Sequence, residues 1–168
     1  MNPYRSFMKK IAIAILVAVV AFQFASCGSK YTFDETRAFT GAWNRFKPIQ
    51  FTVDVQQPGE DCDFHLAVAV DTARYRYSSL PVIFNIETDA GERRFFPATV
   101  LLQDKQGVWK GEWKDGLLVV DQRVRDCFSF NRKGTHSVKV GQATHYYDIE
   151  GIRSLRLYIV PTATDYPE

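Results

Sequence analysis

Apolar and polar side chains alternate along much of the chain beyond residue 50. Phe51, Val53 and Val55, for example, are separated by Thr52 and Asp54. A period of two is typical of a strand that buries one face and exposes the other. The same pattern predicts further strands over residues 64–70, 82–86, 95–102, 108–113, 117–121, 137–140 and 155–159.

Residues that favour turns separate these predicted strands, and no long stretch has the spacing of an amphipathic helix. The turn signals are Pro58-Gly59, Asp89-Ala90-Gly91, Asp115-Gly116 and Lys133-Gly134. Short strands with regularly spaced turns predict an all-β fold, an antiparallel two-sheet β-sandwich of jelly-roll or immunoglobulin-like type. Pro97 lies inside one predicted strand, which we expect at a sheet edge or at a bulge because proline has no N–H to donate.

The first 26 residues have the order of a secretory signal. Arg5, Lys9 and Lys10 precede an apolar run over residues 11–22, which is shorter than the roughly 20 residues of a membrane-spanning helix. Phe24-Ala25-Ser26-Cys27 then resembles the lipobox at which lipoprotein signal peptidase cleaves before a cysteine that carries diacylglycerol. We expect cleavage before Cys27; the alternative is an uncleaved anchor helix.

These boundaries predict a signal peptide over residues 1–26, a lipidated N-terminus and tether over residues 27–47, and a β-sandwich domain over residues 48–168. An acylated Cys27 carries two or three fatty chains such as palmitate, and two or more chains make membrane attachment lasting. An Asp directly after the lipidated Cys resembles an inner-membrane retention signal, and an acidic cluster resembles a surface-export signal. Residues 28–31 contain neither. We therefore expect the outer membrane, facing the periplasm, with the cell surface as the alternative.

The charge of the predicted mature domain is close to neutral. Loss of the signal removes three of the 21 Lys and Arg residues and leaves 18 against 19 Asp and Glu residues. Most of the remaining basic residues are interleaved with acidic ones, whereas proteins that bind the phosphate backbone gather basic residues on one face. Nucleic acid is therefore not an expected partner.

Two cysteines remain after lipidation of Cys27. Cys62 and Cys127 form an even pair in a compartment that permits oxidation. A disulfide between them would close a loop of about 65 residues and stabilise the fold by about 4 kcal/mol, less any strain. The alternative is two packed thiols, because spacing along the chain does not show that the two Cα atoms lie within bonding range.

No residue pattern predicts a catalytic site, a metal site or a cofactor. Asp61, Asp63 and His65 alternate on one predicted strand, but side chains on one strand face are about 7 Å apart, too far to share an ion without a bend. His136 and His145 have no recognisable partners and are expected at the surface or in turns. Motifs of hydrolases, metallopeptidases and phosphate-binding loops are absent from the sequence, so we do not expect an enzyme.

Aromatic residues are the best candidates for a partner or ligand surface. Large aromatic residues and Arg are favoured in protein interfaces, although the same rings can pack in a core. Two tryptophans four residues apart would share one strand face unless Gly111 introduces a bulge. The candidates are Tyr75, Tyr77, Trp109 and Trp113, with Tyr146-Tyr147 as a further pair.

Several segments also occur in a distinctive order. They are Cys27 of the lipobox, Trp43 followed by Pro48-Ile49-Gln50-Phe51, Arg74-Tyr75-Arg76-Tyr77-Ser78-Ser79-Leu80-Pro81-Val82, residues 102–111, Gly134 with Gln142-Ala143, and residues 151–157. In order and spacing they resemble the GldH family of gliding-motility lipoproteins of Bacteroidota, over nearly the whole predicted mature chain. Ser79 departs from the Asn that the family often has, and the family does not vouch for a disulfide.

The resemblance implies a non-enzymatic accessory lipoprotein of the gliding machinery, a system linked to type IX secretion. Its expected role is that of a scaffold or assembly factor for a motility or secretion complex of the cell envelope. The expected partners are membrane lipid, through acylated Cys27, and envelope proteins of that machinery. The alternative, which depends on the aromatic candidates, is a lipid-anchored carbohydrate- or ligand-recognition module, with a glycan as the less favoured partner.

Overall fold

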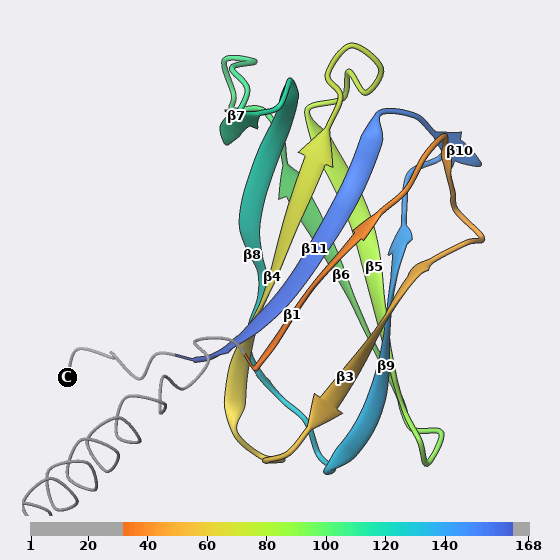
Figure 1. Ribbon diagram of the computed structural model, residues 1–168, viewed down its shortest axis with the longest axis vertical. Helices are drawn as coiled ribbons and strands as arrows, with labels where there is room; N and C mark the ends of the chain where they lie inside the picture. The colour runs from red at the N-terminus through yellow and green to blue at the C-terminus, as the bar shows by residue number, and fades with distance from the viewer. Residues whose placement is uncertain (1–31, 163–168) are drawn as a thin grey trace, which may run out of the picture. The chain divides into compact units, whose positions relative to one another are not determined.

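The computed structural model describes residues 32–162, which form only strands and their connections. Two sheets face each other across a shared core (Figure 1). The five-stranded sheet has the order β1 (Phe33–Ala38), β11 (Ile152–Pro161), β4 (Asp61–Val70), β8 (Leu117–Ser129) and β7 (Glu112–Lys114). The four-stranded sheet has the order β3 (Ile49–Val55), β9 (Gly134–Gln142), β5 (Ser79–Thr88) and β6 (Arg93–Leu101), while β2 (Trp43–Asn44) pairs separately with β10 (Asp148–Ile149). All pairings are antiparallel, which confirms the predicted all-β sandwich.

The connections between the two sheets have the order of a jelly roll. Without the short strands β2, β7 and β10, eight strands remain, and their order is 1-8-3-6 in one sheet and 2-7-4-5 in the other. Consecutive strands therefore mostly alternate between the sheets, as they do in the two Greek keys of a jelly roll. Of the two sandwich types expected from the sequence, the structure has the jelly-roll one.

An aromatic cluster at the centre of the core joins the two sheets. The fully buried ring of Phe64 on β4 has its centroid 5.0 Å from that of Phe128, 5.9 Å from that of Phe96 and 6.3 Å from that of Phe84. Phe128 belongs to the same sheet as Phe64, whereas Phe84 and Phe96 belong to the facing sheet. Edge-to-face ring contacts of this kind are worth about 0.5–1.5 kcal/mol each beyond the area they bury.

β6 forms one edge of the four-stranded sheet and is protected there. Pro97 lies in this strand and pairs with Ile83 of β5, which confirms the edge position as one of the two expected for it. The Gln122 side chain of β8 donates to the carbonyl oxygen of Thr99 at 2.8 Å and accepts from the N–H of Leu101 at 2.9 Å. The Gln122 amide thus satisfies edge groups that are otherwise open to pairing with another chain.

The sandwich begins earlier in the chain than the sequence predicted. Residues 33–38, which the sequence assigned to the tether, form β1 and pair with β11 from Phe33 opposite Ile159 to Ala38 opposite Ser154. Trp43 is only 2% exposed, so the following residues also belong to the domain. β1 lacks a clear alternating pattern because it is an edge strand that exposes most of its residues. Backbone pairing with β11, rather than a strong hydrophobic pattern, makes it a strand.

Two predicted strands have different bounds. β8 continues to Ser129, well beyond the predicted end at residue 121, because its second half is paired with β4 while exposing charged residues. The strand expected over residues 108–113 is mostly a loop, and only Glu112–Lys114 pair with β8 as β7. The loop is closed by an isolated bridge between Gln103 and Trp109.

Gly151 joins β10 to β11 at a position that excludes a side chain. Its φ is +89°, and a Cβ there would stand 2.5 Å from the backbone nitrogen of Tyr75 and 2.8 Å from the carbonyl oxygen of Asp71. We expect Gly151→Ala to lower the free energy of unfolding by about 2–4 kcal/mol, because backbone strain and overpacking add. Urea unfolding followed by circular dichroism measures this loss.

Gly107→Ala is the matched control for this variant. Gly107 has a similar φ of +80°, but a Cβ there meets nothing within 4 Å. Its free energy of unfolding should fall by only about 1–2 kcal/mol, because backbone strain acts there without overpacking. Equal losses in the two variants would contradict the close approach of Gly151 to the loop after β4.

Candidate functional site

The exposed large hydrophobic side chains are concentrated at one end of the sandwich. In the described part of the chain there are nine, and seven lie in the connections that follow β1, β4, β6 and β9 or directly beside them. These connections lie at the end toward which β1 runs, away from its first residue, Phe33. The seven are Phe46, Tyr77, Leu101, Val108, Trp113, Tyr146 and Tyr147.

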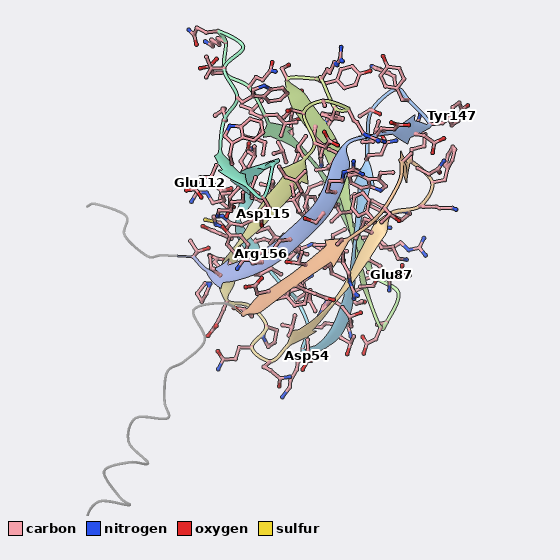
Figure 2. All side chains as sticks on the ribbon, turned by 45° about the horizontal axis from the view of Figure 1, so that its top comes forward. Asp54, Glu87, Glu112, Asp115, Tyr147 and Arg156 are labelled. Carbon is pink, nitrogen blue, oxygen red and sulfur yellow. The ribbon has the colours of Figure 1, made fainter. Side chains whose placement is uncertain are left out.

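Four of these rings, from three separate connections, form two contacting pairs. The ring centroids of Phe46 and Tyr147 are 5.8 Å apart, and those of Tyr77 and Tyr146 are 5.6 Å apart. The guanidinium carbon of Arg45 lies 5.7 Å from the Phe46 centroid and 5.9 Å from the Tyr147 centroid. Figure 2 shows Tyr147 at the outer tip of the domain beside β10. We call these five residues the aromatic end.

A buried amide holds the loop that carries two of these tyrosines. Gln142, at the end of β9, is only 3% exposed. Its Nε2 donates to the carbonyl oxygens of Tyr146 at 3.0 Å and Tyr147 at 3.3 Å. Its Oε1 accepts from the backbone N–H of Thr144 at 2.9 Å and from the hydroxyl of the same residue at 2.6 Å. The N–H of Arg45 donates to the Tyr147 carbonyl oxygen at 2.8 Å, so two connections are also joined to each other.

Tyr75 supports the aromatic end from below. It is 1% exposed, and its hydroxyl donates to the carbonyl oxygen of Ser79 at 2.8 Å. Its ring packs 5.2 Å from the ring of Tyr77, which is 47% exposed. The prediction of Tyr75 as a surface residue was therefore wrong, whereas Tyr77 is exposed as expected. A hydrogen bond with Tyr146, together with burial, raises the pKa of Tyr77.

The two candidate tryptophans do not form one platform. Gly111 has a φ of +101°, and a Cβ there would collide with the carbonyl oxygen of Val119, so the chain bends between them. Trp109 is half-buried and packs against the core, whereas Trp113 is 59% exposed on β7. The chain separates the two rings at Gly111, as the sequence allowed, but through a bend before β7 rather than a bulge within a strand.

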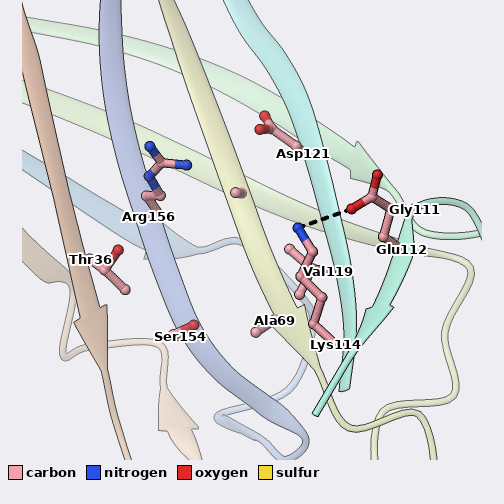
Figure 3. Close-up of a pocket in the computed structure, with 10 residues that line it drawn as sticks. Thr36, Ala69, Gly111, Glu112, Lys114, Val119, Asp121, Ser154 and Arg156 are labelled. Carbon is pink, nitrogen blue, oxygen red and sulfur yellow. Dashed lines mark ion pairs between the residues drawn. The ribbon is translucent and has the colours of Figure 1, made fainter. Parts of the chain in front are cut away.

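The outer face of the five-stranded sheet is hollowed beside β7, and Figure 3 shows the lining side chains of this groove. Its volume is about 580 Å³, and its floor consists of small residues, among them Ala67, Ala69 and Ser154. Because side chains alternate along a strand, Trp113 points away from the groove that its neighbours line. The charged side chains of the walls are Glu112, Lys114, Asp121 and Arg156.

Each of these charged side chains is already paired. Glu112 and Lys114 form an ion pair at 2.9 Å. Arg156 donates to both carboxylate oxygens of Asp34, at 2.6 and 2.7 Å, and these hydrogen bonds hold the pKa of Asp34 below its ordinary value. Asp121 accepts from the hydroxyl of Tyr158 at 2.7 Å. The groove is therefore polar, and its two basic and two acidic side chains balance in charge.

The structure does not bring Asp61, Asp63 and His65 together as one metal-binding group. Asp63 is buried and accepts a hydrogen bond from the Thr162 hydroxyl at 2.6 Å. His65 stacks on Tyr158 with ring centroids 4.7 Å apart, and burial lowers its pKa. Within residues 32–162, no group of three metal-binding side chains is close enough to hold an ion.

His136 does not lie at the surface, and that expectation was wrong. It is 2% exposed on β9, with Nε2 2.9 Å from the carbonyl oxygen of Arg132 and its ring 4.8 Å from that of Phe130. The signal was available in the sequence, since His136 continues the inward alternation of Val138 and Val140.

The family is decided by the match of the whole domain. The family described as GldH lipoprotein matches residues 31–159, a range that spans every strand from β1 to β10 and most of β11. The chain belongs to this family. The match confirms the resemblance in sequence and, through the family's description, supports a lipid-anchored protein related to gliding motility.

Other comparisons with the GldH-family chain add little. No curated protein matches it. Among solved structures, Eiger TNF from S. frugiperda is similar, with 9% identity and a TM-score of 0.30, over 79% of this chain and 99% of that chain. That likeness is too weak to carry an argument about function.

The proposed anchor of this GldH-family lipoprotein lies outside the described residues, which begin at residue 32. This holds for Cys27 and for the whole predicted signal peptide. Across residues 32–162, no helix is long and apolar enough to cross a membrane. Lipidation at Cys27 therefore stays a prediction from the sequence.

The two remaining cysteines lie on paired strands of the GldH-family domain. Cys62 of β4 stands opposite Phe128 of β8, next to Cys127. The structure does not bond the two sulfur atoms: the buried Cys62 thiol donates to the Phe128 carbonyl oxygen at 2.9 Å, and Cys127 is exposed. The disulfide stays a prediction, which thiol chemistry can test.

Burial raises the pKa of the Cys62 thiol from 9.0 to about 12. Because the thiolate is the reactive form, we expect alkylation of native Cys62 at pH 8 to be at least about 100-fold slower than after denaturation. The rate is measured with iodoacetamide in a Cys127→Ser variant. Equal native and denatured rates would contradict the burial of this thiol. The disulfide is tested by titrating the thiols of the denatured, unreduced wild-type protein. Two reactive thiols besides Cys27 would exclude the bridge.

Proposed function

We propose that this protein is a lipid-anchored accessory protein of the outer membrane that acts, without catalysis, as a scaffold or assembly factor for a gliding or secretion complex. The observation that carries the proposal is the polarity of the domain. Exposed apolar side chains gather at the end of the sandwich opposite Phe33, the first residue of β1. Phe33 is also the strand residue nearest to Cys27 in the sequence. An anchored protein with its apolar surface away from the anchor is suited to contact another protein.

The length of the linker limits the distance between membrane and domain. Four residues separate Cys27 from Thr32, whose N–H is already bonded to the Ile159 carbonyl oxygen of β11. With at most 3.8 Å per step, the chain from Cys27 to Thr32 spans about 19 Å or less. β1 then runs from Phe33 to Ala38, about 17 Å toward the aromatic end. The tether therefore joins the sandwich at its Phe33 end, and the aromatic end lies farther along the chain from the acylated residue.

The polar groups of the outer sheet face support a structural role. Arg156, Asp34, Tyr158 and Asp121 are bonded to one another rather than directed as a group at one point in the groove. Catalytic groups, in contrast, converge on a reacting atom and commonly have strongly perturbed pKa values. The outer membrane with the domain in the periplasm is the proposed location, since residues 28–31 carry neither of the signals for other destinations.

Cys27→Ala should abolish labelling by radioactive palmitate and release the protein from the membrane fraction. The reason is that the acyl chains supply the lasting attachment. Labelling and fractionation of cells measure both effects, and Cys62→Ala, a buried cysteine away from the lipobox, is the control that should keep both. Persistent membrane attachment of Cys27→Ala would contradict the anchor.

Chemical crosslinking followed by purification from membranes tests the scaffold part of the proposal. The wild-type protein should be recovered with subunits of an envelope motility or secretion complex. Recovery of the protein alone would count against a scaffold.

Carbohydrate recognition is a second candidate, favoured by the groove. A polar, charge-balanced hollow of about 580 Å³ over small residues has the size of small-molecule sites and suits an uncharged, hydroxyl-rich ligand. A glycan array should then give a ligand whose affinity falls about tenfold or more in Asp121→Ala, since a hydrogen bond to a charged group is lost. Asp54→Ala, on the other sheet, is the control. Equal affinity of the Asp121→Ala variant, or no ligand on the array, would exclude the groove as a sugar site.

A further inference from the structure

The aromatic end carries positive charges that the rest of the domain does not neutralise. Arg45, Lys47 and Arg76 are exposed residues directly beside Phe46 or Tyr77 in the chain, and among residues 32–162 they have no carboxylate within ion-pair distance. Arg45 instead lies over two of the rings, and Arg76 donates only to the carbonyl oxygen of Ala73 at 3.4 Å. Within the described part of the chain, these three cations therefore have no carboxylate partner.

The nearby carboxylates are used inside the domain. Asp71 accepts from Arg153 at 2.7 Å, and this pairing holds its pKa below the ordinary value. Asp148 accepts from the amide of Asn44 at 2.8 Å, and Glu150 lies 3.7 Å from Arg74. Asp71 and Glu150 are thus paired with arginines, whereas Asp148 keeps its charge beside a neutral amide. Arg45, Lys47, Arg74, Arg76 and Arg153 together still outnumber these three acids, which leaves a net positive charge at this end.

We infer that the aromatic end, with Lys47 and Arg76, is the docking surface for an acidic segment of another envelope protein. This inference rests on the proposed function and names the chemistry of the partner. Exposed tyrosines and arginines are the residues that contribute most to protein interfaces, and complementary charge adds specificity and speeds association.

The surface is already ordered before a partner binds. Gln142 is bonded to the backbone at Thr144, Tyr146 and Tyr147, and the indole N–H of Trp43 donates to the Lys47 carbonyl oxygen at 3.2 Å. A surface whose loops are fixed in advance loses less conformational entropy on binding. The rings can therefore contribute their buried area to affinity.

The geometry favours a protein over the anchor membrane as the occupant. The tether of four residues joins the domain at its Phe33 end, and β1 carries the chain about 17 Å from Phe33 toward the aromatic end. A glycan is less suited, because the rings pack against one another and against Arg45 instead of presenting a single flat platform. Lipid and glycan are treated below as outcomes of the test.

Photocrosslinking in living cells tests the docking surface on the full-length, anchored protein. Tyr147, 66% exposed, is replaced by p-benzoylphenylalanine, and the control position is Phe95, 60% exposed on β6. We expect irradiation to attach one protein at position 147 but not at position 95. Mass spectrometry should place the crosslink in a segment with a net negative charge.

Charge inversion then tests the chemistry of recognition. Lys47→Glu combined with Arg76→Glu should lower the yield of the crosslink by about tenfold or more, and added salt should lower it in the wild-type background. Lys133→Glu, in the β8–β9 connection at the opposite end, is the control and should have no effect. Circular dichroism and urea unfolding confirm that the exposed substitutions leave the fold intact.

Several results would overturn the inference. They are a crosslink at position 147 to lipid, to glycan or to a basic segment, a yield equal to that at position 95, and a yield that charge inversion leaves unchanged. Palmitate labelling and co-purification of the same variants report on the proposed function separately. If the wild-type protein still co-purifies with envelope subunits, only the docking surface is wrong; if it is recovered alone, the scaffold itself is excluded.

Discussion

Packing of the Phe64 ring between the two sheets is the contact on which the sandwich depends. Phe64 touches rings from both layers, so it fixes how β4 in the five-stranded sheet lies over β5 and β6 in the other. Once alternate side chains of every long strand are committed to this core, the opposite faces and the connections are the only places left for function. The functional surfaces of this domain are therefore an outer sheet face and a set of loops.

The two ends of the sandwich differ because the connections at each end contain different residues. At the end near residue 32, the connections contain turns and charged residues such as Glu92 and Arg132, which pair with each other at 3.0 Å. At the other end, buried polar residues fix long connections that carry exposed rings. Gln142 is the clearest case. It is the buried last residue of β9, and its one amide is bonded to several residues of the loop that follows. The same burial that makes the domain stable thus also fixes the shape of its exposed surface.

Charges are distributed differently over the two candidate surfaces. On the outer face of the five-stranded sheet, each charged side chain of the groove has a partner within the same sheet. Around the aromatic end, the carboxylates are bonded within the domain, and three basic side chains have no carboxylate partner among the described residues. A paired, neutral face costs little to leave in water, whereas an unpaired basic surface around exposed rings gains from an acidic partner. This contrast is the physical reason to rank protein docking above ligand binding in the groove.

The sequence by itself determined the class of the fold and the family. A period-two pattern, with turns between strands, is enough to give an antiparallel sandwich, because each strand must bury one face. It also placed Pro97 at an edge or a bulge and indicated, through Gly111, that Trp109 and Trp113 could separate. The alternation that buries His136 was present as well, although the residue was assigned to the surface.

Only the tertiary structure decided which residues share a surface. β1 has too little alternation to be recognised alone, and pairing with β11 brings it into the sheet. Tyr75 and Tyr77 have similar sequence surroundings, yet the fold-back of their loop buries one ring and exposes the other. Phe46 and Tyr147 are about a hundred residues apart in the chain and meet because β2 pairs with β10. Local patterns report which face of a strand is buried, but contacts between distant loops depend on the order of strands in the sheets, which local patterns do not contain.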